Sequence, residues 1–148
     1  MRMFVIAKVL VIDEMGKVLL IRRSDTDPRR PLQWDFPGGF VEQGEDIGAA
    51  VVREAQEEAG ITVGTPWLAI ARSDVSPEHG SGTYLIFVTR IAGEPKITLS
   101  YEHDQYKWVD PSALLQEITY PRQLKLLEYI LNNDLLEDTD TKHSYNPS

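Results

Sequence analysis

The feature that most constrains the fold is an apolar and acidic segment between Gly44 and Gly60. Its apolar residues recur at helical spacing, so we expect a helix that begins at about Glu45 or Asp46 and ends at Ala59. Acids suit the positive end of the helix dipole, and the second glycine suits a left-handed turn that stops the helix. One face of this helix needs a covering surface because it carries Ile47, Val51, Val52, Ala55 and Ala59.

Apolar, β-branched runs on both sides of this helix can supply that surface. Residues 3–13 and 17–23 flank a turn at Gly16 and predict an antiparallel hairpin. Residues 24–33 are rich in proline and charge and predict a loop. Three further apolar runs predict strands, at residues 61–72, 83–92 and 106–110.

The last third of the chain predicts two helices. Residues 110–118 open with Asp-Pro-Ser, and residues 121–133 place leucine and isoleucine at helical spacing. The order of strands, helix, strands and helices predicts an α/β sandwich, with one domain over residues 1–136. Residues 137–148 carry no recurring apolar pattern, so we expect a flexible tail.

Three acids crowd into five positions of the central helix: Glu54, Glu57 and Glu58. They flank the apolar stripe, so a helix packed on a sheet would hold them half sheltered, where unpaired carboxylates are costly. Converging carboxylates favour a divalent cation that prefers oxygen ligands, which means Mg²⁺ or Mn²⁺. The competing interpretation is an acidic helix face exposed to solvent.

Composition excludes several classes of function. The chain has no cysteine, so disulfides, thiolate metal sites and cysteine nucleophiles are absent. A formal charge of −8 disfavours nucleic acid as the main partner. The N-terminal apolar run alternates into charge and lacks a cleavage site, and no run is long enough to span a membrane. We therefore expect a cytoplasmic protein.

The spacing from Gly39 through Glu45, Arg53, Glu54, Glu57 and Glu58 to Ile61 resembles the Nudix box of the Nudix hydrolase superfamily. The preceding residues 34–39, "WDFPGG", and the later residues 101–110 are also similar to family members. Ala55 departs from the family, which usually has a larger aliphatic residue there. The resemblance implies a Nudix-type α/β/α sandwich with a central mixed sheet. It also implies hydrolysis of a nucleoside diphosphate linked to another group.

The resemblance further implies a role for each matching residue. Mg²⁺, with Mn²⁺ as a substitute, would be bound by the carboxylates of Glu54, Glu57 and Glu58 and by the carbonyl oxygen of Gly39. Arg53 and Glu45 would orient this cluster. The bound ions would neutralise the diphosphate and activate water for attack on phosphorus.

Several further residues are candidates for contact with substrate or water. Glu102 resembles a family loop glutamate that acts as general base or binds a further metal. Its neighbour His103 should point the opposite way, so we expect a surface or hydrogen-bonding role for it. Arg22 and Arg23 alternate on a strand, so one faces the cleft; we expect phosphate contacts from Arg23, Gly38 and Gly39. We expect Arg29, Arg30 and Glu42 to be solvated loop residues.

Alternatives within the family differ in substrate. Isopentenyl diphosphate isomerases resemble this chain but use a cysteine, and mRNA decapping members carry basic extensions. A nucleoside triphosphate cleaved to monophosphate and pyrophosphate is the leading expectation, followed by ADP-ribose or another nucleoside diphosphate sugar. A nucleotide-sensing domain without catalysis is the alternative from another class, and a homodimer is left open.

Overall fold

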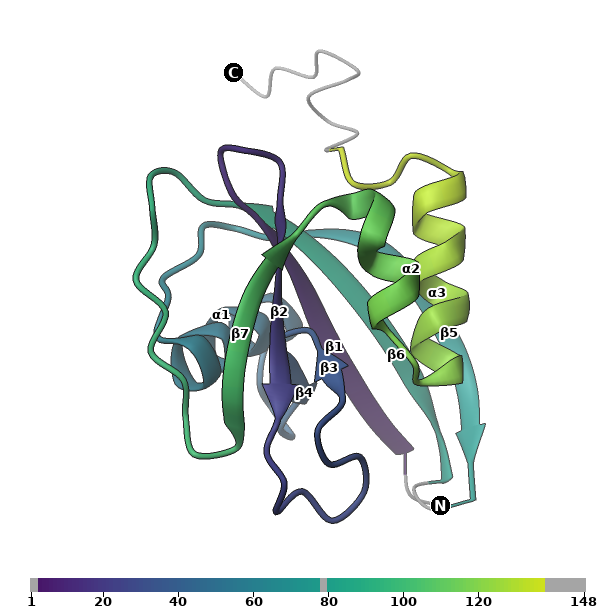
Figure 1. The fold of residues 1–148 in the computed structure, drawn as a ribbon. Coiled ribbons are helices and arrows are strands. Elements are labelled where there is room, and N and C mark those ends of the chain that lie inside the picture. Colours follow the sequence, from purple (N-terminus) through teal and green to yellow (C-terminus); the bar gives the residue numbers. More distant parts are fainter. Residues whose placement is uncertain (1–2, 78–79, 138–148) are drawn as a thin grey trace.

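The computed structural model describes residues 3–77 and 80–137, which form a mixed sheet between helices (Figure 1). Its strands are β1 (Met3–Ile12), β2 (Val18–Arg23), β3 (Trp34–Asp35), β4 (Gly38–Phe40), β5 (Trp67–Ser76), β6 (Gly80–Arg90) and β7 (His103–Val109). Its helices are α1 (Ile47–Ala59), the 3-10 turn η1 (Pro111–Ala113), α2 (Leu114–Glu117) and α3 (Pro121–Asn132).

The sheet is built around β1. Its main path runs β3-β2-β1-β6-β5, with β4 paired to β1 and β7 paired to β2. β1 and β6 are parallel over their whole lengths, while the other pairs are antiparallel. The expected hairpin is present, because β1 pairs with β2 across a turn in which Gly16 adopts a φ of 78°.

Alternate side chains of the central strands enter two separate cores. On β1, Leu10 and Ile12 pack with α2 and α3, whereas Val9 and Val11 pack with α1. The alternation follows from the two-residue period of a strand. Because both faces are covered, almost the whole strand is apolar, and a charged residue within it is unusual.

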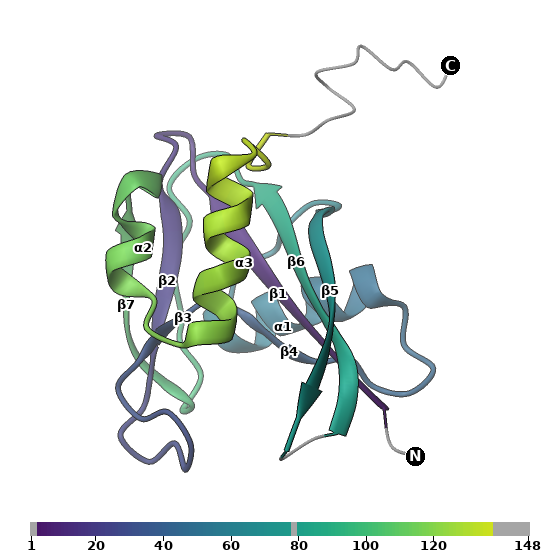
Figure 2. The ribbon, with the colours of Figure 1, turned by 90° about the vertical axis from the view of Figure 1, so that its right-hand side faces the viewer.

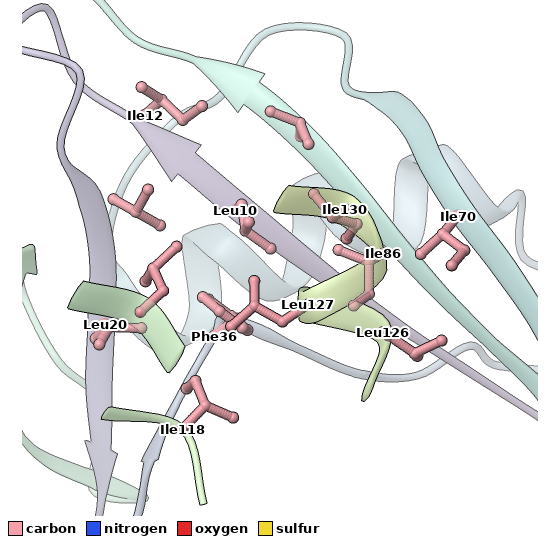
Figure 3. Close-up of a cluster of buried hydrophobic side chains, with 13 residues drawn as sticks. Leu10, Ile12, Leu20, Phe36, Ile70, Ile86, Ile118, Leu126, Leu127 and Ile130 are labelled. Atoms are coloured by element: carbon pink, nitrogen blue, oxygen red, sulfur yellow. The ribbon is translucent and has the colours of Figure 1, made fainter. Parts of the chain in front are cut away.

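The helices form one layer on each face of the sheet. α1 lies on one side, and α2 and α3 lie on the other (Figures 1 and 2). On the α3 side, Phe36, Leu127 and Ile130 are fully buried between helix and sheet (Figure 3). The expected α/β/α sandwich is confirmed.

Helix α1 ends at Ala59, as the sequence predicts, and begins at Ile47, one residue after the expected Asp46. Asp46 is the N-cap, and its side chain accepts a hydrogen bond from the backbone N–H of Ala49. Gly60 is the C-cap with a φ of 68°. The expected apolar face is wrong in one respect: Ile47 is exposed, whereas Glu58 is buried. The buried face is therefore rotated toward the acidic residues.

Strand boundaries differ from expectation in the middle of the chain. Residues 61–66 are not a strand, although Ile61 and Val63 are buried beside α1, because Gly64 and Pro66 interrupt the extended run. Strand β6 begins three residues earlier than expected, at Gly80. The short strands β3 and β4 were not anticipated from the sequence.

The C-terminal part follows the sequence prediction in outline. Residues 110–118 divide into η1 and α2, and α3 ends one residue before the expected position. The expected tail falls almost wholly on residues 138–148, which lie outside the described residues. No helix in the described part of the chain is long and apolar enough to cross a membrane.

Candidate active site

A cleft of about 790 Å³ lies at the end of β1 where α1, the β4 segment and three loops meet. Its walls include the acidic edge of α1, residues 38–40, part of the loop 23–33, residues 102–103 and residues 119–123. The cleft therefore joins segments that are far apart in the sequence. It contains all of the residues for which we expected a metal-binding role.

Two glycines let the chain pass between β1 and α1 at the floor of the cleft. Gly38 has a φ of 139°, and a Cβ there would lie 2.2 Å from the carbonyl oxygen of Ala7. A Cβ on Gly39 would lie 3.1 Å from Oε1 of Glu54. A side chain at either position would displace the backbone or the carboxylate, so the glycine pair keeps the turn close to the acids.

Glu58 is the most buried acid of the cleft, with 7% of its surface exposed. Its Oε1 accepts a hydrogen bond of 2.7 Å from the N–H of Gly38, and its Oε2 lies 3.5 Å from Nε2 of His103. Burial raises the pKa of Glu58 to about 8, and the nearby Glu54 charge adds to the effect. Burial also raises the pKa of Glu54, whose carboxylate is hydrogen-bonded to Glu58.

Arg53 connects the remaining acids. Its guanidinium forms a two-point ion pair with Glu45, with Nε–Oε2 at 2.7 Å and Nη2–Oε1 at 3.0 Å. Its Nη1 also contacts Glu54 at 3.3 Å and Glu57 at 3.1 Å. The Glu45–Arg53 pair expected beside the carboxylates is therefore present in the geometry, and it raises the pKa of Arg53.

The chemistry of the donor set suits a divalent cation, although the side chains are not gathered around a single point. Within residues 3–77 and 80–137, no three acidic or histidine side chains stand close enough together to hold an ion as arranged. The reason is that Glu57, whose side chain is 58% exposed, turns toward Arg53. Glu54 and Glu58 already meet in a site where burial makes negative charge unfavourable, which a hard cation would relieve.

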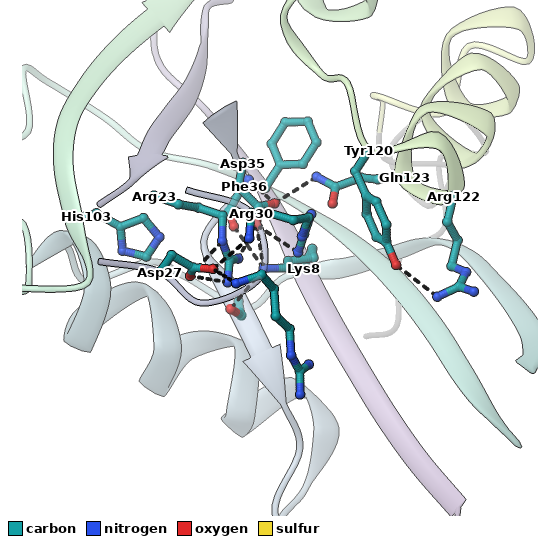
Figure 4. Close-up of polar contacts among 12 residues, drawn as sticks. Lys8, Arg23, Asp27, Arg30, Asp35, Phe36, His103, Tyr120, Arg122 and Gln123 are labelled. Carbon is teal, nitrogen blue, oxygen red and sulfur yellow. Dashed lines mark hydrogen bonds and ion pairs between the residues drawn. The ribbon is translucent and has the colours of Figure 1, made fainter. Parts of the chain in front are cut away.

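A second charged cluster lies behind the glycine turn, centred on the fully buried Asp35 (Figure 4). Its Oδ2 contacts Lys8 Nζ at 3.1 Å and Arg23 Nη1 at 3.0 Å. Its Oδ1 accepts a hydrogen bond of 2.8 Å from the side chain of Gln123. Burial alone would raise the pKa of Asp35. The positive charges of Lys8, Arg30 and Arg23 instead hold this pKa well below its usual range.

The wall opposite α1 is aromatic and cationic. The guanidinium of Arg30 stacks on the ring of Tyr120 at 4.1 Å from its centroid. Arg122 donates hydrogen bonds of 3.0 Å to the hydroxyls of Tyr84 and Tyr120. The expectation that Arg30 is solvated is wrong, because Asp27 accepts its backbone N–H and the ring of Tyr120 covers its side chain. Arg29 and Glu42 are exposed, as expected.

The two arginines at the end of β2 point to different surroundings. Arg23 lines the cleft and pairs with Asp27 and Asp35, so its position agrees with the expected one. Arg22 points away and forms a two-point ion pair with Asp104. The carboxylates that hold Arg23 fix its guanidinium at the edge of the cleft.

Glu102 and His103 differ in burial, although both line the cleft. Glu102 is exposed and lines the cleft, whereas His103 is 7% exposed. The surface role considered for His103 is therefore wrong. Burial lowers its pKa to about 4, so the ring is neutral at physiological pH. Its buried Nδ1 has no hydrogen-bond partner among residues 3–77 and 80–137.

Sequence reasoning missed the buried cluster behind the turn. One signal was visible: Lys8 is a single charge within an otherwise apolar run of ten residues. Asp35 stands directly before "FPGG", and nothing local indicated that its charge is buried. Tyr120, Arg122 and Gln123 precede or open a helix and reach the cleft only through the tertiary fold.

Comparison with protein families gives one match over most of the chain. A family model described as "NUDIX domain" matches residues 3–130. The "Nucleoside triphosphatase NudI" of Escherichia coli (strain SE11) is 32% identical over 115 residues, covering 71% of this chain and 81% of that protein. The "Nucleoside diphosphate-linked moiety X motif 6" protein of Xenopus laevis is 30% identical over 118 residues. That match covers 78% of this chain, but the chain spans only 51% of the Xenopus relative.

Solved structures show the same fold. The crystal structure of a MutT protein from Methanosarcina mazei Go1 superposes with a TM-score of 0.77 and 28% identity, covering 90% of this chain and 96% of the other. The solution structure of the Escherichia coli ORF135 protein gives a TM-score of 0.73 at 24% identity, with coverages of 89% and 91%.

Proposed function

The chain belongs to the NUDIX domain family, and from this premise we propose that it is a metal-dependent hydrolase of a diphosphate linkage in a nucleotide. The leading substrate class is a nucleoside triphosphate, cleaved to a monophosphate and pyrophosphate. The observation that carries the proposal is the pair of half-buried and buried carboxylates, Glu54 and Glu58, beside the glycine turn at the floor of the cleft. The triphosphate class is supported by the names of the bacterial relatives.

Glu54, Glu57 and Glu58, together with the Gly39 carbonyl oxygen, would hold the cation. When bound, a divalent ion supplies positive charge to the diphosphate oxygens and Lewis acidity for the attacking water. Mg²⁺ is the proposed ion, with Mn²⁺ as a substitute, because all four ligands are hard oxygen donors.

The surrounding residues position the reactants. Arg53 is tied to Glu45, so it stays beside the carboxylates and limits the directions in which Glu54 and Glu57 can turn. Arg23 presents a guanidinium to the cleft from the opposite side, where it can bind a phosphate oxygen. Glu102 lines the cleft and is exposed, so it can accept a proton from an attacking water.

The proposal also includes expectations about location, domain organisation and the orientation of the substrate. The enzyme would act in the cytoplasm on small nucleotides. One domain would span residues 1–136, and a homodimer remains compatible with this organisation. The substrate would enter with its phosphates toward α1 and its remaining group toward the aromatic wall of Tyr84 and Tyr120.

A nucleotide panel tests the proposed function. The purified protein is incubated with Mg²⁺ and each nucleoside triphosphate, ADP-ribose and nucleoside diphosphate sugars, and the products are separated by chromatography. We expect a monophosphate and pyrophosphate from at least one triphosphate. Cleavage of ADP-ribose alone would assign the other substrate class. Binding of nucleotides without any cleavage would identify a sensing domain and contradict catalysis.

A further inference from the structure

Lys8 is a buried ammonium that faces the turn before the acidic helix. It lies within β1 and is 8% exposed. Its Nζ donates to Asp35 Oδ2 at 3.1 Å, to the carbonyl oxygen of Gly38 at 3.2 Å and to that of Phe36 at 3.4 Å. An ammonium has three hydrogens to donate, so these acceptors account for its full capacity. The group is fixed in place and is not a mobile surface charge (Figure 4).

The Gly38 residue joins Lys8 to the carboxylates. Lys8 and Gly38 are paired directly across the β1–β4 ladder, and Ala7 is paired with Gly39. The carbonyl oxygen of Gly38 accepts from Lys8, while the N–H of the same residue donates to Glu58. A displacement of this turn would therefore move both Glu58 and the Gly39 carbonyl group.

Structural stability alone does not account for a lysine at this position. Burying an ammonium costs several kcal/mol in desolvation, and a well-packed apolar residue in place of a buried ion pair is often neutral or stabilising. The neighbouring residues of β1 are apolar, so an apolar side chain suits the strand. The fold instead supplies Asp35 to compensate the lysine charge.

We propose that Lys8 is a positioning residue of the active site, whose ammonium holds the Gly38–Gly39 turn so that Glu58 and the Gly39 carbonyl oxygen can bind a divalent cation together. This inference rests on the proposed function, because it assumes that the cation binds to these carboxylates. Lys8 acts through the turn, because its three hydrogen bonds go to Asp35 and to the carbonyl oxygens of Phe36 and Gly38.

The affinity for a metal ion tests this role, and the mobility of the turn separates it from a purely electrostatic one. A positive charge near the site repels a cation but also favours the ionised form of Glu58, so the charge of Lys8 alone acts on metal binding in both directions. If Lys8 holds the turn, its removal loosens two ligands and weakens binding. Loss of a residue that orients metal ligands typically reduces affinity by about 10- to 100-fold.

The experiment measures Mn²⁺ binding to the full chain by electron paramagnetic resonance, without substrate. The variants are Lys8→Met, which keeps the length of the side chain, and Lys125→Met, which removes the same charge from an exposed position on α3. We expect Lys8→Met to bind Mn²⁺ at least ~10-fold more weakly and Lys125→Met to bind it as the wild type does. Unchanged or tighter binding by Lys8→Met would overturn the proposal.

Hydrogen exchange of the Gly38 amide provides a second readout that needs no metal. We expect exchange at least about tenfold faster in Lys8→Met, because the restraint from a charged hydrogen bond is lost. If Lys8→Met does not fold, Lys8→Gln, which leaves a neutral donor, is measured in both assays with the same expected directions. Unchanged exchange in a folded variant contradicts positioning. If the wild type binds no Mn²⁺, the proposed function fails, and the exchange result alone decides the role of Lys8.

Discussion

At the scale of single residues, the cleft contains two carboxylates, Glu54 and Glu58, whose charge burial makes unfavourable. Glu58 is surrounded by protein on most sides, and its hydrogen bond from Gly38 does not offset the burial. The chain nevertheless places Glu54 beside it. Such an arrangement disfavours the charged form of both groups, which suits the cation site proposed above.

Replacing a carboxylate by its amide separates catalysis from folding. Glu58→Gln keeps an oxygen that can accept from Gly38 and removes the group that would be ionised when a cation binds. We expect turnover to fall at least ~10²-fold, with a melting temperature that is unchanged or higher. We expect the same loss of turnover for Glu57→Gln. The control is Glu128→Gln on the exposed side of α3. Full activity in both cleft variants would show that neither carboxylate takes part in catalysis.

Asp35 makes stability depend on pH. Its pKa in the folded chain lies below the ordinary value of 3.8, so its contribution is complete above about pH 5 and is lost as the pH falls through the folded pKa. We expect Asp35→Asn to lower the unfolding free energy by about 3–5 kcal/mol at pH 7, because Lys8 loses its partner.

Urea unfolding at pH 7, 5 and 3 measures this effect. We expect the gap between wild type and Asp35→Asn to narrow toward pH 3, whereas the exposed Asp25→Asn variant should match the wild type throughout. A gap that is independent of pH would show that the ionised form of Asp35 is not what stabilises the fold.

At the scale of elements, helix α1 must begin at a fixed residue for its acids to face the cleft. Asp46 caps the first turn by accepting from Ala49. We expect Asp46→Ala to destabilise the protein by about 0.5–2 kcal/mol, and Asp46→Asn to have little effect, because asparagine caps equally well. Thermal unfolding of the two variants provides the measurement. Equal stability of alanine and asparagine variants would show that the cap is unimportant.

The sequence predicts elements where local chemistry decides them. The caps of α1, the hairpin at Gly16 and the cleft-facing Arg23 all follow from local rules. The burial of Asp35 does not, because its partners Lys8 and Gln123 are 27 and 88 residues away. The sequence also places the start of β5 too early, at Ile61 instead of Trp67. Ile61 and Val63 are buried outside the sheet, and an apolar run of this kind predicts a strand from sequence alone.

At the scale of the whole molecule, cation binding should stabilise the fold. A ligand that binds only the folded chain raises its stability by about 2.7 kcal/mol at a concentration 100 times the dissociation constant. We expect the melting temperature to rise with Mg²⁺ in the wild type and to rise less in Glu58→Gln. Excess chelator should abolish turnover while the circular dichroism spectrum stays unchanged. Full turnover with chelator present would show that the reaction does not require a metal ion.

The most direct test of the central claim is hydrolysis in ¹⁸O-labelled water with Mg²⁺, followed by mass spectrometry of the products. Water that attacks phosphorus leaves its oxygen on a phosphate group, and the cleft gathers carboxylates suited to a metal-assisted reaction of that kind. From a nucleoside triphosphate we predict a monophosphate and intact pyrophosphate, with one labelled oxygen in one of these two products. Label on a sugar carbon, or release of inorganic phosphate in place of pyrophosphate, would contradict the account.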